Sequence, residues 1–189
     1  RPARIIGKVH GKPQRYAFVE PEDGVTEDVF VGGENLGDAM HRDRVEVEIV
    51  GRRRGNRMEG RVIRIVERAH EEVVGYYETV GKEARVLPAE RKIWHHIYIP
   101  RKDRHGARGG DVVLARITEF PKEGRMPRGE IVEVLGKPQQ EDIEIQVIIH
   151  KHGIPHEFPS EVMEEAAQCP AEVGEEQLMG REDLRGEPI

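Results

Sequence analysis

The feature that most constrains the fold of this chain is an internal repeat. A shift of 68 positions aligns Gly7 with Gly75, 29–31 with 97–99, Asp43 with Asp111, and Val45 with Val113. A shift of 69 positions aligns 60–63 with 129–132. The unit is longer than the roughly 20 to 50 residues of a solenoid repeat, and only two copies occur. The chain is therefore predicted to contain two tandem copies of one small domain.

Short alternating segments, broken by Gly, Pro and Asp, predict strands within each copy. The clearest is 45–50, VEVEIV, whose period of two is typical of a strand with one solvated face. The segment 51–57, GRRRGNR, has too much Gly and too little apolar content for a strand and is predicted to be a loop. Five short strands at this spacing indicate a small barrel. In the first copy the expected strands cover 5–9, 16–20, 28–31, 44–50 and 60–66.

The predicted organisation has three parts: a first barrel over 1–68, a second over 69–138, and an acidic connector over 139–189. Within the connector, 142–149 alternates apolar and polar residues and predicts one more strand. The stretch after Pro159 predicts a short helix with Ser160 as its N-cap. The fold class is thus all-β, with two tandem five-stranded barrels followed by a short strand and helix connector.

The formal charge of −6 conceals an asymmetry along the chain. Residues 1–138 carry 27 basic and 23 acidic side chains, whereas 139–189 carry 3 and 13. This contrast indicates a polyanion as partner of the first part, and an acidic surface that discourages such contacts in the second.

No apolar run approaches the roughly 18 residues of a membrane span, so no membrane contact is expected. The single cysteine, Cys169, excludes an intramolecular disulfide and fits a reducing compartment. A cytoplasmic protein is therefore predicted. Because the chain begins at Arg1 rather than Met, we expect a piece of a longer protein.

Aromatic and basic residues in the first copy are the strongest candidates for a binding site. Tyr16 and Phe18 are two apart and share one face of a strand, and Phe30 on the next strand can join them. Rings that stack bases, beside cations that follow phosphates, are typical of single-strand nucleic-acid binding. The alternative is that these rings fill the barrel core. The cations nearby are Lys8, Lys12, Arg15, Arg52, Arg53, Arg54 and Arg57.

The second copy carries a basic stretch over 92–108, in which Trp94 and Tyr98 are candidate stacking residues and Arg101 and Lys102 candidate phosphate contacts. The 68-residue shift places Ala84 and Val86 where the first copy has Tyr16 and Phe18. We therefore expect phosphate contact and domain packing here more than stacking, with a plain solvated surface as the alternative. A metal site at His150, His152, His156 and Glu157 is considered and not favoured, because no further partner is evident.

The segments 7–9 (GKV), 15–19 (RYAFV) and 28–31 (DVFV) resemble the cold-shock domain, an OB-type five-stranded barrel that binds single-stranded RNA or DNA. The resemblance implies a stacking role for the three rings. The chain departs from the family at Gly11, Lys12, Gly32 and Gly33, where aromatics are often found. A smaller platform and weaker binding are therefore expected.

A wider resemblance covers nearly the whole chain. The segments 33–45, 74–77, 129–136, 152–159 and 181–189 are together similar to the N-terminal region of the ribonuclease R group of the ribonuclease II family. Those enzymes join two cold-shock domains to a catalytic domain and degrade RNA from the 3′ end with magnesium. The resemblance implies that the chain stops at Ile189, before the Asp-rich catalytic motif.

Catalysis by this segment alone is not expected, because two-metal hydrolysis requires clustered carboxylates and the Asp residues here are scattered. Neither a catalytic residue nor a bound metal or other cofactor is predicted in this chain. Magnesium and an intramolecular catalytic domain are expected for the parent enzyme. The prediction is thus single-stranded RNA binding by the N-terminal part of a 3′-to-5′ exoribonuclease. A separate RNA chaperone of the cold-shock type and a protein-docking adaptor are the alternatives.

Overall fold

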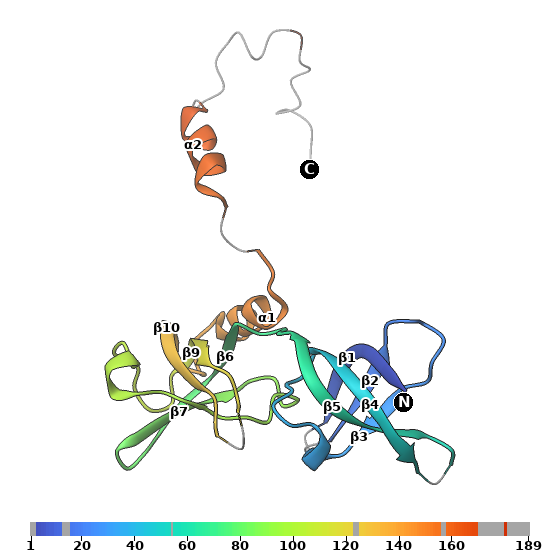
Figure 1. The fold of residues 1–189 in the computed structure, drawn as a ribbon. Helices are drawn as coiled ribbons and strands as arrows, with labels where there is room; N and C mark the ends of the chain where they lie inside the picture. The colour runs from blue at the N-terminus through green and yellow to red at the C-terminus, as the bar shows by residue number, and fades with distance from the viewer. Residues whose placement is uncertain are drawn as a thin grey trace. The chain divides into compact units, whose positions relative to one another are not determined.

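The computed structural model describes residues 3–12, 16–53, 55–122, 125–155, 158–169 and 180. It contains two closed barrels, with strand orders β1-β2-β3-β5-β4 and β10-β8-β7-β6-β9 (Figure 1). The prediction of two tandem five-stranded barrels is confirmed. The first barrel consists of β1 (Arg4–Lys12), β2 (Tyr16–Pro21), β3 (Val29–Val31), β4 (Arg44–Arg52) and β5 (Met58–Glu67). The second consists of β6 (Glu72–Val80), β7 (Glu83–Pro88), β8 (Ile97–Tyr98), β9 (Val112–Glu119) and β10 (Arg128–Gly136).

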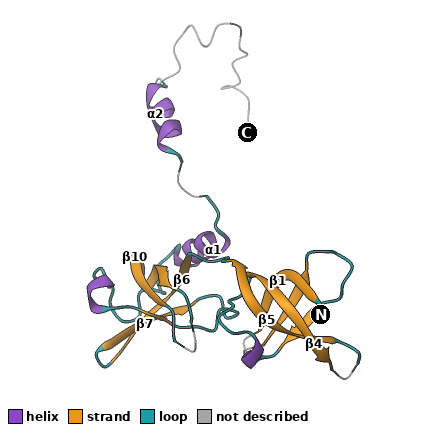
Figure 2. Cartoon of the chain, in the orientation of Figure 1, coloured by secondary structure: helices purple, strands orange, loops and turns teal. Residues whose placement is uncertain are grey.

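Alternation along the strands separates the core from the outer face, as β4 illustrates. Val45 and Val47 are fully buried in the first barrel. Glu46 and Glu48, between and after them, point outward and pair with arginines of β5. In Figure 2 both barrels contain strands joined by loops, and helix is confined to short segments. Two of these are the 3₁₀ turns η1 (Gly33–Asn35) and η2 (Arg101–Asp103).

The two barrels repeat the same buried aspartate at one turn. The Asp43 carboxylate accepts the backbone N–H of Met40 at 2.8 Å, and Asp111 accepts that of Arg108 at 2.7 Å. In each copy the aspartate carbonyl also accepts a backbone N–H from the first strand of its barrel, with N to O distances of 2.9 and 2.8 Å. The sequence repeat at Asp43 and Asp111 therefore marks a turn that closes each barrel.

The first hairpin differs between the copies by one residue. Lys12 pairs with Tyr16 across three intervening residues, whereas Val80 pairs with Glu83 across two. The register of β7 is consequently offset by 67 rather than 68 from that of β2. The residues that stand in the places of Tyr16 and Phe18 are Glu83 and Arg85, so the assignment of Ala84 and Val86 to those places is wrong.

The segment after the second barrel forms a helix, α1 (Ile143–His152), where a strand was predicted. Apolar residues at 143, 145, 147 and 149 satisfy a period of two, but with Ile148 they also place apolar side chains on two faces of a helix. Because both barrels are closed, they offer no edge on which another strand could pair. The helix instead buries Ile143 in a small cluster with Val74 and Val112.

The helix α1 ends at Gly153, which has the left-handed φ of 61°. Its N–H donates to the carbonyl of His150, and the N–H of Ile154 donates to that of Ile149 at 2.9 Å. This arrangement satisfies carbonyls that would otherwise lack a partner at the helix end.

From Pro155 onward the chain forms a separate unit, which contains the predicted short helix, α2 (Ser160–Gln168). Its N-cap is Pro159, and no side chain caps it, so the expectation that Ser160 is the N-cap is wrong. Within the described residues, no helix is long and apolar enough to cross a membrane.

Candidate nucleic-acid interface

Three aromatic rings gather on the outer face of the first barrel. Tyr16 and Phe18 come from β2 and Phe30 from β3, where Phe18 lies directly opposite Phe30 in the ladder. The centroid of the Tyr16 ring is 5.9 Å from that of Phe18 and 5.7 Å from that of Phe30, and the Phe18 and Phe30 centroids are 5.8 Å apart. We call this group the aromatic platform.

The platform does not belong to the core of the barrel. The neighbours of its rings in sequence, Ala17, Val19, Val29 and Val31, are fully buried and pack together inside the barrel. Because successive side chains of a strand point to opposite faces, the rings must lie outside. Each ring is only half-buried, although large apolar side chains are usually hidden from water. The alternative that these rings fill the core is therefore wrong.

Three cations lie over the platform. The Arg53 guanidinium carbon is 4.3 Å from the Phe30 centroid, the Arg57 guanidinium carbon 5.3 Å from the Phe18 centroid, and the Lys12 ammonium 5.9 Å from the Phe18 centroid. Such contacts stabilise the cations against the negative faces of the rings. The β4–β5 loop therefore brings positive charge to the rings, as its sequence predicts.

The other cations predicted in the first copy do not lie over the rings of the platform in the described residues. The Arg52 guanidinium donates to the carbonyl of Asn56 at 3.1 Å and so braces the β4–β5 loop. Lys8 is exposed on β1, beside Arg44 in the ladder. Arg15 and Arg54 lie outside the described residues.

His10 belongs to this surface, although the sequence reasoning did not single it out. It lies opposite Phe18 in the β1–β2 ladder, and its Nε2 is 2.8 Å from a carboxylate oxygen of Glu20. The available signal was the alternation along β1, which places Lys8, His10 and Lys12 on one face. A hollow beside Phe18 is also lined by Glu27, Asp28 and Arg57. The surface thus combines stacking faces, cations for phosphates, and carboxylates that can accept hydrogen bonds from base amino groups.

The corresponding face of the second barrel carries charge instead of rings. Arg85, in the place of Phe18, pairs with Glu78, with 3.0 Å between its Nη2 and the carboxylate oxygen. Tyr98 keeps the place of Phe30, and the guanidinium carbon of Arg128 is 5.7 Å from its ring centroid. Arg101 and Lys102 are exposed on η2. Of the three places that carry rings in the first barrel, the second barrel therefore keeps a ring at one, Tyr98.

Trp94 lies between the barrels, where it packs against the core of the first. A Cβ atom on Gly11 would be 2.5 Å from Cζ3 of the Trp94 ring and 2.9 Å from the carbonyl oxygen of Lys92, so only glycine permits this approach. Met40 in turn packs into the core of the second barrel. The expected packing role of the second copy is thus visible at Trp94.

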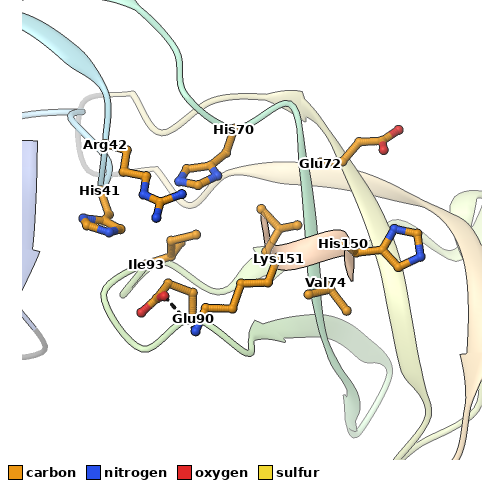
Figure 3. A pocket seen from close by; sticks show the side chains of 10 residues that line it. His41, Arg42, His70, Glu72, Val74, Glu90, Ile93, His150 and Lys151 are labelled. Carbon is orange, nitrogen blue, oxygen red and sulfur yellow. Dashed lines mark ion pairs between the residues drawn. The ribbon is translucent and has the colours of Figure 1, made fainter. Parts of the chain in front are cut away.

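A pocket at the junction of the two barrels and α1 gathers several ionisable groups (Figure 3). His41 and His70 stack with their ring centroids 6.4 Å apart, and Glu90 pairs with Lys151 at 3.0 Å. His41 is 4 % exposed, and its Nδ1 accepts the N–H of Gly11 at 3.2 Å. Burial lowers the pKa of His41 to about 4, and the positive charge of Lys92 adds to this effect. Burial also lowers the pKa of His70.

The burial of His41 at the junction should make the unfolding free energy depend on pH. His41 is neutral in the folded chain down to about pH 4, whereas its unfolded pKa is 6.5. Between these values the unfolded state binds more protons, so the unfolding free energy should fall as pH falls from 6.5 to 4, by up to about 3 kcal/mol. Urea unfolding at several pH values should show a weaker dependence in His41→Asn, whose amide can still accept the Gly11 N–H. The exposed His152→Gln is the matched control, and an equal pH dependence in wild type and His41→Asn would contradict this assignment.

Among the described residues, no three His, Cys, Asp or Glu side chains are placed to hold a metal ion. His150 and His152 lie on α1, while His156 and Glu157 are outside the described residues.

Comparisons with known proteins give the chain its family. Residues 7–65 match the model of the ribonuclease B OB domain, and residues 86–159 match a cold shock domain. Ribonuclease R of Thermotoga maritima is 39% identical over 175 residues, which cover 92% of this chain and 24% of that protein. For ribonuclease R of Vibrio cholerae the identity is 36% over 187 residues, with 98% and 23% covered. This chain is a cold-shock and OB-domain region of the ribonuclease R family.

Solved structures agree with the ribonuclease R region in fold. RNase R of Mycoplasma genitalium, solved in complex with ribose-methylated single-stranded RNA, superposes with a TM-score of 0.77 at 17% identity, over 89% of this chain and 27% of that one. Yeast Ssd1, described as a pseudonuclease, has a TM-score of 0.64 at 18% identity, over 77% of this chain and 24% of that one. Because this fold also occurs in a pseudonuclease, it does not by itself establish hydrolysis. The chain spans about a quarter of the length of the two ribonuclease R relatives compared above.

Proposed function

We propose that this ribonuclease R region binds single-stranded RNA on the aromatic platform of its first barrel. The observation that carries the proposal is the clustering of Tyr16, Phe18 and Phe30 on the outside of the barrel, with Lys12, Arg53 and Arg57 over their faces. Exposed rings beside cations provide both stacking and phosphate contact, and every base has a face that can stack. The relative solved with single-stranded RNA supports the choice of ligand.

Arg53 and Arg57 have a specific part in this proposal. Their guanidinium groups lie over the rings of Phe30 and Phe18. A base can stack on those rings only if the guanidinium groups move aside, and both arginines would then be available to contact the adjacent phosphates. Stacking and phosphate contact are therefore coupled on this surface, and the binding should have little preference for sequence.

We also propose that the RNA is passed to a catalytic region of a longer protein, a 3′-to-5′ exoribonuclease. The support is the family assignment together with the quarter length of the relatives that this chain spans. The magnesium ions of such an enzyme would be held by that region. The codons that follow residue 189 in the gene test this part: an Asp-rich motif is expected, and a stop codon would contradict it.

Titration of the chain with single-stranded RNA at several salt concentrations tests the binding. Affinity should fall as salt rises, with a logarithmic slope of about −0.7 for each phosphate contacted, which for three to five contacts is about −2 to −3.5. Oligonucleotides of different sequence should bind within about tenfold of one another. The same sequence annealed into a duplex is the control, because its bases cannot stack on the rings, and it should bind more weakly. Absence of binding even at low salt would rule out the proposal.

A further inference from the structure

A groove of about 440 Å³ lies between the two barrels. The first barrel contributes Gly33 and Leu36 to its lining, from the segment after β3. The second contributes Trp94, His95 and Met126, from the loops that precede β8 and β10. We call this the inter-barrel groove. Its volume is within the roughly 300 to 1,000 Å³ of pockets that bind small organic groups, and none of its residues belongs to the aromatic platform.

The lining of the inter-barrel groove is suited to a flat aromatic group. Trp94 packs against the core of the first barrel and also lines the groove, so its ring is shared between the two. The centroid of the His95 ring is 5.6 Å from that of Trp94, and Met126 is 50 % exposed. Unstacked RNA bases stack on Trp and His rings, and a methionine thioether packs well against aromatic rings. A nucleobase is therefore a chemically matched occupant.

The inter-barrel groove continues the aromatic platform along the chain. A Cβ atom on Gly32 would be 3.7 Å from Cε1 of Phe30, so this glycine borders the platform, and the next residue, Gly33, already lines the groove. Because neither glycine has a side chain, a ligand can approach the backbone closely between the two sites. Arg125 also lines the groove and is exposed, so it can contact a phosphate. A strand stacked on Phe30 can therefore continue into the groove.

The size of the inter-barrel groove favours RNA over a protein as its occupant. A stable interface between separate chains takes roughly 800 Å² from each partner, whereas this groove accommodates roughly one nucleotide. We propose that it binds the part of an RNA strand that leaves the aromatic platform, with one base stacked on Trp94 and a phosphate at Arg125. The two barrels thus hold one strand together. This inference rests on the proposed function, because the platform supplies the strand.

Intrinsic fluorescence tests the inter-barrel groove directly, because Trp94 is the single tryptophan of the chain. Tryptophan emission would be followed while unlabelled oligouridines of increasing length are added, and the anisotropy of labelled oligouridines would give the affinity. Oligonucleotides long enough to span both sites should quench Trp94, with the same midpoint as the binding curve. They should also bind about tenfold or more tightly than trinucleotides, because one further base is stacked.

The variant Arg125→Glu/Met126→Ala alters the groove without changing the platform. Both side chains are exposed, so the barrel should stay folded. The long oligonucleotides should lose the quenching and about tenfold in affinity, while trinucleotides should bind within about twofold of the wild type. The matched control is Lys82→Glu/Val80→Ala, which makes the same kinds of change at exposed residues of the β6–β7 hairpin. It should keep both the quenching and the affinity.

Three outcomes would overturn the inference. They are RNA binding at every length with unchanged tryptophan emission, full quenching and affinity in Arg125→Glu/Met126→Ala, and tryptophan emission that changes with the concentration of the chain alone, which would identify a second copy as the occupant. The first of these leaves the platform proposal intact. Failure of the platform has a different signature. If replacing Tyr16, Phe18 and Phe30 together by alanine leaves RNA affinity unchanged while RNA still quenches Trp94, the platform proposal fails and the groove remains an RNA site.

Discussion

Replacing Tyr16, Phe18 and Phe30 together by alanine should weaken binding of single-stranded RNA by about thirtyfold or more. Each base stacked on an aromatic ring contributes about 1 to 3 kcal/mol by alanine substitution, and three rings can support at least two bases. The loss should persist at high salt, because stacking is screened far less than phosphate contacts are. Fluorescence anisotropy with a labelled oligonucleotide at two salt concentrations would measure it.

Two controls make the platform experiment specific. Tyr76→Ala removes a tyrosine that is 42 % exposed on β6, outside the platform, and should leave affinity unchanged within about twofold. Phe18→Leu/Phe30→Leu keeps apolar side chains on the outer face and removes only the aromatic faces, so it should lose RNA binding while the barrel remains folded. Retention of full affinity in the leucine variant would show that the rings do not stack bases.

Asp43→Ala should strongly destabilise the first barrel. Asp43 is fully buried and its carboxylate accepts three hydrogen bonds: from the backbone N–H groups of Met40 and Ala69, at 2.8 and 3.0 Å, and from the Arg68 guanidinium at 2.7 Å. Removing the carboxylate leaves these donors without an acceptor, and the loss of one partner of a buried ion pair costs about 3 to 5 kcal/mol. Urea unfolding followed by circular dichroism would measure the change in unfolding free energy.

The effect of Asp43→Ala should extend to the junction between the barrels. The guanidinium carbon of Arg68, which Asp43 holds, lies 4.4 Å from the ring centroid of Phe120 in the second barrel. Asp43→Asn keeps one acceptor oxygen and should cost less than alanine, while the exposed Glu34→Ala should be nearly neutral. A loss below about 1 kcal/mol for Asp43→Ala would contradict the structural role given to this carboxylate.

The barrels could be predicted from the sequence because local pattern and repeat agree there. The VEVEIV alternation of β4 and the matching turns at Asp43 and Asp111 each follow from residues close in sequence. The repeat shift of 68 residues assigned the side chains of β7 to the wrong faces. The hairpin loop before β7 is one residue shorter than in the first barrel, and a change of one residue in register moves every side chain of a strand to the other face. Arg85 consequently took the place that the sequence reasoning gave to Val86.

The parts that were missed depend on contacts between distant segments. The period of α1 fits a strand as well as a helix, and only closure of both barrels removes the edge that a strand would need. The same period placed Tyr16 and Phe18 on one face without deciding whether that face is the inside or the outside. Trp94 packs on Gly11, and His41 is buried, where the two barrels contact each other. These contacts join residues that are far apart in sequence, so no local sequence pattern predicts them.

Ultraviolet cross-linking of the chain to a single-stranded RNA, followed by mass spectrometry of the cross-linked peptides, tests whether RNA lies on the aromatic platform. Cross-links should be concentrated on β2 and β3, at Tyr16, Phe18 and Phe30, with few on the face of the second barrel that carries Glu83 and Arg85. Loss of these cross-links in the leucine variant would identify the rings as the stacking surface. Cross-links confined to the second barrel, with none on β2 or β3, would contradict binding of RNA on the aromatic platform.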